Sequence, residues 1–388
     1  MTRTSPGADL PRGLTLAMAF GAGVLGASLH YQMPMLAKLA GEFSASPERV
    51  GLVPMATLGA YALGIFFLVP LGDRFEKRTL VLGKSVLLTL SYAVAAMSVS
   101  LEMLVAVSVC IGVFGSATQD IVPLAARIAP PGKQGRVLGQ VMTGIFLGIL
   151  FGRSFGGLIT EYFGWRAAFA GAALITGAVV PMLAMTLPKT GGGENISYAK
   201  LMASVVALYR RHPELRQAVT MQGMLLIAYA AFWATLAPML ESAFGLGPTV
   251  AGLFAIPGAA GSVIASHVGR WSDAYGPRRI AGFGPLMVAS AFLFMGLLQS
   301  SIVAIVVGTM LFDLGIRTAQ VANQSQIYAL DPKAGARLNS VLFLHMFGGQ
   351  AIGAISGSVT WAHYGWTGVM TLCVAFAVAA IGVHLSRR

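Results

Sequence analysis

Apolar stretches about twenty residues long recur along the chain, and this repetition limits the possible folds more than any other feature. A helix needs roughly 20 apolar residues to span the hydrocarbon core of a bilayer. Charged residues make up only 10% of the chain, whereas about a quarter of the residues in a soluble domain are charged. The sequence therefore predicts an all-α membrane protein with twelve transmembrane helices. The predicted spans are about 13–36, 48–71, 79–99, 101–124, 135–160, 165–187, 217–241, 248–269, 279–299, 301–324, 336–360 and 364–385.

Basic residues are distributed unevenly between the two sides of the predicted membrane. With the N-terminus in the cytoplasm, only Lys38, Arg49 and Arg166 fall on the opposite side, and Arg153 and Arg317 lie at membrane depth. The other Lys and Arg residues then face the cytoplasm, as the positive-inside rule requires. This orientation predicts that both termini are cytoplasmic. It also accounts for the net charge of +12 without nucleic acid as a partner.

The two halves of the chain repeat each other at an offset of about 200 residues. The pairs 201 positions apart are Arg136 with Arg337, Gly148 with Gly349, Gly152 with Gly353, Gly156 with Gly357, Gly164 with Gly365 and Trp165 with Trp366. We therefore predict two pseudo-symmetric six-helix halves, at residues 1–187 and 217–388, joined by a cytoplasmic linker at 188–216. Duplicated halves with a substrate site between them are typical of secondary transporters.

Two basic loops occupy equivalent positions after the second and the eighth predicted span, and read PLGDRFEKR (70–78) and GRWSDAYGPRR (269–279). An aspartate beside basic residues at a helix end can pair with them or cap a neighbouring helix. The loops resemble the G-x-x-x-D-R-x-G-R-R/K signature of the major facilitator superfamily, with Val69, Glu76 and Ala274 as departures from it. This resemblance implies the major facilitator fold and a gating role for the loops. The gating-loop residues are Asp73, Arg74, Arg78, Gly269, Asp273, Arg278 and Arg279.

The stretch GILFGRSFGG (148–157) resembles the span-5 antiporter signature G-x-x-x-G-P-x-x-G-G, with Arg153 in the place of the proline. Small residues at every fourth position let helix backbones approach closely, so we expect these glycines to pack between the halves. The predicted helix-packing residues are Gly148, Gly152, Gly156, Gly157, Gly349, Gly353 and Gly357. Residues 123–153 and 313–340 also resemble twelve-span drug:proton antiporters. The span-4 arginine of that group is missing, because Ser108 or Ile111 takes its place.

Ionisable residues inside the predicted spans cost about 2.5–3.5 kcal/mol each in lipid and are functional candidates for that reason. Asp313 and Arg317 are four residues apart, the spacing of an ion pair on one helix face. Asp313 and His345 fall near the middle of the bilayer, and Asp120 falls near its cytoplasmic side. We interpret Asp313, Asp120, His345 and Arg317 as proton-coupling candidates. A purely structural ion pair remains the alternative for Asp313 and Arg317.

Polar and aromatic residues interrupt several of the apolar spans. The resemblance implies that spans 1, 4, 7 and 10 line the substrate cavity. The cavity candidates are His30, Tyr31, Gln32, Arg153, Gln119, Trp233 and Asn323. Aromatic and amide groups suit amphipathic or aromatic compounds. Arg153 either lines the cavity, or extends to the interface, or bonds exposed carbonyls.

A membrane-embedded enzyme is the main competing class. No H-E-x-x-H pair, no cysteine-based metal site and no phosphate-binding G-x-x-x-x-G-K-[ST] sequence occurs, so we predict no catalytic residues, no metal and no cofactor. The predicted function is proton-coupled efflux of small organic or drug-like molecules. A proton-coupled importer of a small metabolite and a non-transporting sensor are the alternatives. The expected partners are a small-molecule substrate, protons and lipid, for a monomer in a bacterial inner membrane.

Overall fold

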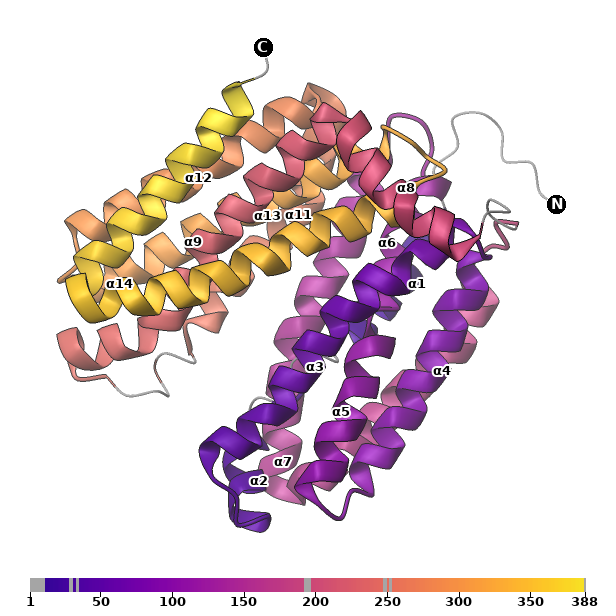
Figure 1. Cartoon of the computed structure of the whole chain (residues 1–388), viewed down its shortest axis with the longest axis horizontal. Helices are drawn as coiled ribbons and strands as arrows, with labels where there is room; N and C mark the ends of the chain where they lie inside the picture. Colours follow the sequence, from indigo (N-terminus) through magenta and orange to yellow (C-terminus); the bar gives the residue numbers. More distant parts are fainter. Residues whose placement is uncertain are drawn as a thin grey trace. The chain divides into compact units, whose positions relative to one another are not determined.

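The computed structural model describes residues 11–27, 31–32, 35–191, 197–246, 250 and 253–386, and its regular elements are helices (Figure 1). Nine helical stretches within these residues are long and apolar enough to cross a membrane, and α1 is apolar but shorter. The predicted all-α membrane fold is therefore confirmed.

The helices follow most of the predicted spans, but the helix predicted at 101–124 is interrupted between residues 115 and 118. The N-terminal half contains α1 (Arg12–Gly26), α2 (Leu36–Glu42), α3 (Pro47–Phe67), η3 (Val69–Asp73), α4 (Lys77–Ala96), α5 (Leu101–Gly115), α6 (Thr118–Ile128) and α7 (Gln134–Thr186). The linker forms α8 (Tyr198–Arg211). The C-terminal half contains α9 (Pro213–Phe244), α11 (Ala255–Tyr275), α12 (Pro277–Leu297), α13 (Ile302–Tyr328) and α14 (Gly335–Leu385).

The long helices α7 and α14 each contain two predicted spans joined at a single glycine. Gly164 has φ 84° and Gly365 has φ 59°, in the region that residues with a side chain rarely adopt. Figure 1 shows α14 running in one direction and then turning back. In both copies a buried tryptophan, Trp165 or Trp366, follows the glycine. The sequence repeat therefore corresponds to the same turn in both halves.

Side-chain burial divides each helix into a face packed inside the protein and a face outside it. The largest buried side chains include Tyr92 and Phe169 in one half and Phe232, Phe292 and Phe312 in the other. Exposed apolar side chains are frequent, and a soluble monomer rarely collects so many of them. Leu174 is 76% exposed and Met185 is 86% exposed, for example. Such surfaces suit lipid as the surrounding solvent.

The chain forms two compact units that exchange short segments. Unit 1 contains Met1–Pro131, Gln140–Val205 and Pro332–Ser340, and unit 2 contains Gly132–Gly139, Val206–Asp331 and Val341–Arg388. Each unit therefore includes the start of a helix whose remainder belongs to the other unit. Those two helix starts belong to α7 and α14, and both are contacted by the aspartates described below.

Candidate functional site

Helix α13 carries a buried ion pair in unit 2. Arg317 donates from Nε to Asp313 Oδ2 and from Nη2 to Asp313 Oδ1, each at 3.4 Å. The Asp313 side chain is 2% exposed and that of Arg317 is 19% exposed. Arg317 Nη1 also donates to Oε1 of Gln320, three residues further along the same helix, at 3.4 Å. Tyr229 of α9 is a further interaction partner of Arg317. The predicted pair thus forms, with two polar neighbours within reach of its cation.

Aromatic rings of α9, α12 and α13 pack beside this ion pair. Phe312, adjacent to Asp313, lies with its ring centroid 4.8 Å from Phe232 and 6.1 Å from Tyr229. Trp233 lies 6.1 Å from Tyr229, and its buried indole N–H has no hydrogen-bond partner among the described residues. These aromatic rings make the surroundings of the ion pair largely apolar, with a few polar groups such as the Tyr229 hydroxyl and the Trp233 N–H. This composition fits amphipathic ligands.

A cluster of amides joins α9 to α13 near the other end of α13. Asn323 donates from Nδ2 to Gln222 Oε1 at 3.2 Å and to the Ala218 carbonyl at 3.4 Å. Gln324 is fully buried, and neither polar atom of its side chain has a partner in the described part of the chain. Unpaired buried amides are costly, so such groups call for a ligand or water to satisfy them.

Unit 1 contains a second buried ion pair, between Lys84 of α4 and Asp120 of α6. The Lys84 Nζ lies 2.7 Å from Asp120 Oδ2, and the two side chains are 7% and 0% exposed. Lys84 Nζ also lies 3.5 Å from Ser116 Oγ. The other carboxylate oxygen of Asp120, Oδ1, is buried without a partner among the described residues. Among the described residues, Asp120 thus forms an ion pair through one carboxylate oxygen and has no hydrogen-bond donor at the other.

Gln119, the neighbour of Asp120, connects three segments of unit 1. Its Nε2 donates to Tyr61 Oη at 2.9 Å. Pro123 has no N–H to bond the carbonyl of the residue four positions earlier, which is that of Gln119. Asn339 Nδ2 donates to this carbonyl at 3.1 Å and to Gln119 Oε1 at 3.3 Å. A proline inside α6 thus frees an acceptor, and the start of α14 uses it.

Asp73 accepts hydrogen bonds from four groups, and we call this arrangement the Asp73 clasp. The donors are Lys77 Nζ at 3.2 Å, the Ala336 N–H at 3.1 Å, and the N–H and Nε of Arg337, both at 3.0 Å. The first N–H groups of a helix lack partners within it, so a carboxylate there is favourable. Arg337 also donates to Ser204 of the linker helix α8 at 2.9 Å. Asp73 therefore caps α14 and is buried between two cations.

Asp273 makes the equivalent but simpler contact in unit 2, the Asp273 clasp. It accepts from the N–H groups of Gly135 and Arg136 at 2.7 Å and 2.8 Å, at the start of α7. Gly135 and Gly269 approach so closely that a Cβ on either would meet the backbone of the other. Pro277 stands four residues after Asp273, where Lys77 follows Asp73, so this clasp has no matching lysine. Asp273 is also only half-buried.

The remaining basic residues of the two loops have different surroundings. Arg74 lies 5.2 Å from the centroid of the Phe75 ring, and Arg78 donates to the Ala184 carbonyl of α7. Arg278 lines a small pocket, and Arg279 is exposed.

The predicted cavity residues of the first span are described only in part. Gln32 is buried, and its Nε2 donates to Thr57 Oγ1 of α3 at 2.6 Å. Tyr31 packs against Tyr92 and Phe155, each with ring centroids 5.8 Å apart. His30 lies outside the described residues.

Two further candidates complete the set. Arg153 lies on helix α7, but its side chain is outside the described part of the structure. His345 lies half-buried on α14, where Nδ1 is 2.8 Å from the Val341 carbonyl and the ring stacks on Tyr209 of α8 at 5.3 Å. The structure therefore places His345 beside the linker helix.

The helix-packing glycines make close contacts. Gly148 lies against Gly23 of α1, and Gly349 lies against Gly223 of α9. The other glycines of the motif continue these two contacts: Gly152 meets Ala27, Gly156 meets Tyr31, Gly353 meets Ile227 and Gly357 meets Ala231, while Gly157 is half-buried on α7. These contacts lie within one unit each, and the expected packing between halves stays a prediction. The spacing fixes how closely two helices approach, but it carries no information about which helix is the partner.

Several residues of these clusters were not predicted from the sequence. They are Lys84, Tyr229, Gln222 and Asn339. A usable signal existed for Lys84, since it lies seven residues after Lys77 of the loop signature and shares one face of α4 with it. Asn339 carried no comparable signal, because its partner lies 220 residues away.

Repeated halves of apolar helices with ion pairs buried inside them define a multi-pass membrane transporter rather than a soluble protein. The model of the Major Facilitator Superfamily matches residues 18–266 and 218–387. The chain belongs to this superfamily.

Comparisons with individual proteins agree with this assignment. The chain is 32% identical to the uncharacterized transporter YgaY of Escherichia coli O157:H7, over 97% of this chain and 95% of that protein. It is 29% identical to a probable transporter of Streptomyces coelicolor, with 93% and 84% covered.

Solved structures of low sequence identity share the fold. The human organic anion transporter MFSD10 aligns with a TM-score of 0.81 at 16% identity, over 97% of this chain and 100% of that one. The proton:xylose symporter XylE aligns with a TM-score of 0.75 at 14% identity, over 95% and 94%.

Proposed function

We propose that this transporter exchanges protons for small organic or drug-like molecules and exports them across a bacterial inner membrane by alternating access. The observation that carries the proposal is the ion pair of Asp313 and Arg317, buried inside a helix long and apolar enough to span the membrane. Buried ionisable residues in such helices are costly and commonly serve proton or substrate transfer.

The proton step follows from the surroundings of the pair. When Asp313 gains a proton it loses its charge, and its attraction for Arg317 falls. Arg317 already has Gln320 and Tyr229 as neighbours, so its guanidinium has other partners once the carboxylate is neutral. The pair can thus exist in two arrangements with different charge, and two discrete arrangements are what a coupled carrier requires.

The substrate class follows from the rings and amides of the same helices. Tyr229 and Trp233 are half-buried and offer flat apolar surfaces, and the Trp233 N–H has no acceptor among the described residues. Gln324, on the helix that carries Asp313, adds an amide without a partner in the same described part of the chain. We therefore propose amphipathic or aromatic compounds as substrates.

The two clasps are proposed as the gating elements of the transport cycle. Asp73 and Asp273 each hold the first N–H groups of a long helix by a carboxylate. Bonds of this kind are strong enough to favour one state and few enough to be broken in the other. We propose no catalytic role for either clasp.

The test is proton movement in proteoliposomes that contain a pH-sensitive dye. An inward proton gradient is imposed, and lipophilic cations, aromatic acids, sugars and nucleosides are added in turn. We expect substrate-dependent dissipation of the gradient by the wild type and loss of it in Asp313→Asn. The matched control is Glu102→Gln, which removes a carboxylate from an exposed ion pair.

The outcomes separate the competing functions. Proton flow in the same direction as a labelled substrate would identify an importer and reject antiport. Unchanged coupling in Asp313→Asn would make this ion pair structural. No proton or substrate movement with any compound, in protein that remains folded, would favour a sensor.

A further inference from the structure

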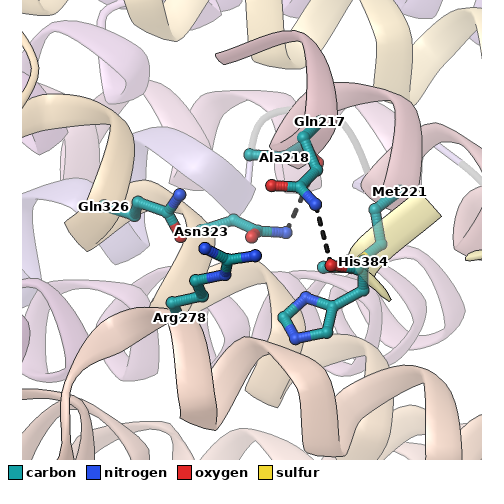
Figure 2. A pocket seen from close by; sticks show the side chains of 7 residues that line it. All are labelled: Gln217, Ala218, Met221, Arg278, Asn323, Gln326 and His384. Carbon is teal, nitrogen blue, oxygen red and sulfur yellow. Dashed lines mark hydrogen bonds between the residues drawn. The ribbon is translucent and has the colours of Figure 1, made fainter. Parts of the chain in front are cut away.

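A small polar pocket lies in unit 2, where the ends of four helices meet (Figure 2). Gln217 comes from the first turns of α9 and Arg278 from the first turn of α12. Gln326 comes from the last turn of α13, and His384 from the last turn of α14. Ala218, Met221 and Asn323 complete the lining, and the interior has room for about one water molecule, while the mouth of the pocket is open to solvent. Except for Asn323, no residue of this lining belongs to the predicted substrate cavity.

The pocket carries one fixed positive charge, that of Arg278. Arg278 is exposed to the pocket and has no hydrogen-bond or ion-pair partner among the described residues. It lies close enough to His384 for the two side chains to repel each other when the histidine is protonated. None of the seven lining residues is an acid. The N-terminus of α12 adds a partial positive charge at the same place.

Neighbouring groups position the donors of the pocket and occupy two backbone carbonyls that would otherwise compete for them. Gln217 Nε2 donates to the carbonyls of Val383 and His384, both at 2.8 Å, so the last turn of α14 does not offer these groups to the pocket. Gly282 of α12 leaves room for the imidazole, since a Cβ there would come within 2.6 Å of His384 Nε2. Figure 2 shows the Arg278 guanidinium pointing toward the Asn323 amide and the His384 ring.

We propose that the open mouth of this pocket binds a phosphate group, with Arg278 as its principal ligand and Gln326 and His384 as further donors. A guanidinium presents a planar fork of donors that matches phosphate oxygens, and amides and an imidazole add single bonds. Basic pockets between helix ends on the cytoplasmic side of a membrane suit the headgroups of phospholipids. The predicted orientation puts this end of unit 2 on that side. The phosphate therefore comes from a lipid headgroup or from a free phosphate compound.

The experiment measures binding without any transport assay. Purified protein in neutral detergent is titrated separately with phosphatidylglycerol and with inorganic phosphate, and the melting temperature is recorded. We expect a saturable rise for the wild type. For Arg278→Gln we expect about tenfold weaker apparent binding, the loss typical for one charge-assisted contact. The matched control is Arg279→Gln, which removes the same charge from the next residue without touching the pocket lining.

The outcomes decide both the site and the source of the phosphate. A response to the lipid alone identifies a headgroup site, and a response to inorganic phosphate identifies a soluble ligand. Because phosphate stabilises many proteins non-specifically, the readout is the difference between the two variants. Equal binding by Arg278→Gln and Arg279→Gln would overturn the proposal, as would no saturable response in the wild type. If Arg278→Gln does not stay monodisperse, Gly282→Ala, which displaces the His384 ring, replaces it under the same criteria.

Discussion

Lys84 Nζ and Asp120 Oδ2 lie 2.7 Å apart, and the two side chains are almost completely buried among the helices of unit 1. Removing one partner of such a pair leaves the other charge buried and uncompensated, which costs about 3–5 kcal/mol. We therefore expect Lys84→Met to lower the free energy of unfolding by about that amount. Denaturant unfolding in detergent micelles measures this change.

The control for Lys84 is an ion pair of the same type at the surface. Arg49 and Glu102 are 61% and 69% exposed, so Arg49→Gln should change the free energy of unfolding by less than about 1 kcal/mol. The double variant Lys84→Met/Asp120→Leu should recover most of the loss, because neither charge of this pair is left without the other. Equal effects of the two single variants would contradict the buried-pair interpretation.

The two clasps should differ in strength. Asp73 accepts from four donors and is buried, whereas Asp273 accepts from two backbone N–H groups and is half-buried. Asp73→Asn should therefore lower the melting temperature more than Asp273→Asn, because it removes the charge of the carboxylate that Lys77 and Arg337 both contact. Parallel melting of the two purified variants checks this order. A larger effect at Asp273 would show that burial does not set the strength of a clasp.

The close contact of Gly148 with Gly23 should not tolerate a side chain. A Cβ on Gly148 would meet the Gly23 backbone, which cannot move aside as a side chain can. Gly148→Ala should cost about 1–3 kcal/mol through overpacking. Gly59→Ala is the matched control, since Gly59 lies inside α3 and no atom of the described residues comes near its added Cβ. There the greater helix propensity of alanine should stabilise by up to about 1 kcal/mol. The fraction of protein that stays monodisperse after heating distinguishes the two.

Glu42 should make stability depend on pH. Hydrogen bonds from Arg166 and Trp165 lower the pKa of this exposed carboxyl below its ordinary value. The contribution of a glutamate with a lowered pKa is present above its unfolded pKa of about 4.3 and is lost as the pH falls below it. The melting temperature of the wild type should therefore fall more steeply below about pH 4.3 than that of Glu42→Gln. Parallel slopes in the two proteins would exclude this contribution.

The sequence predicted the transmembrane helices well, because their apolar length is a local property. It also predicted the pairing of Asp313 with Arg317, since four residues of helix bring the two together without help from the fold. The aspartates of the two loops were expected to pair with basic residues or cap a helix, and Asp73 does both.

The missed contacts depend on distant segments. Lys84 is buried because α6 brings Asp120 to it, 36 residues further along the chain. The sequence predicts the depth of His345, near the middle of the bilayer, but depth does not predict which residues are its neighbours. Its neighbour Tyr209 comes from the linker, whose docking no periodicity in the sequence indicates.

The exchange of short segments between the units has a consequence for any attempt to make the protein in two pieces. A gene interrupted after Leu187 would encode a first polypeptide with the start of α7 but without Asp273, and a second with the start of α14 but without Asp73. Each product would thus carry an uncapped helix end whose cap is encoded by the other. The two polypeptides should accumulate in cells when synthesised together and be degraded when either is synthesised alone.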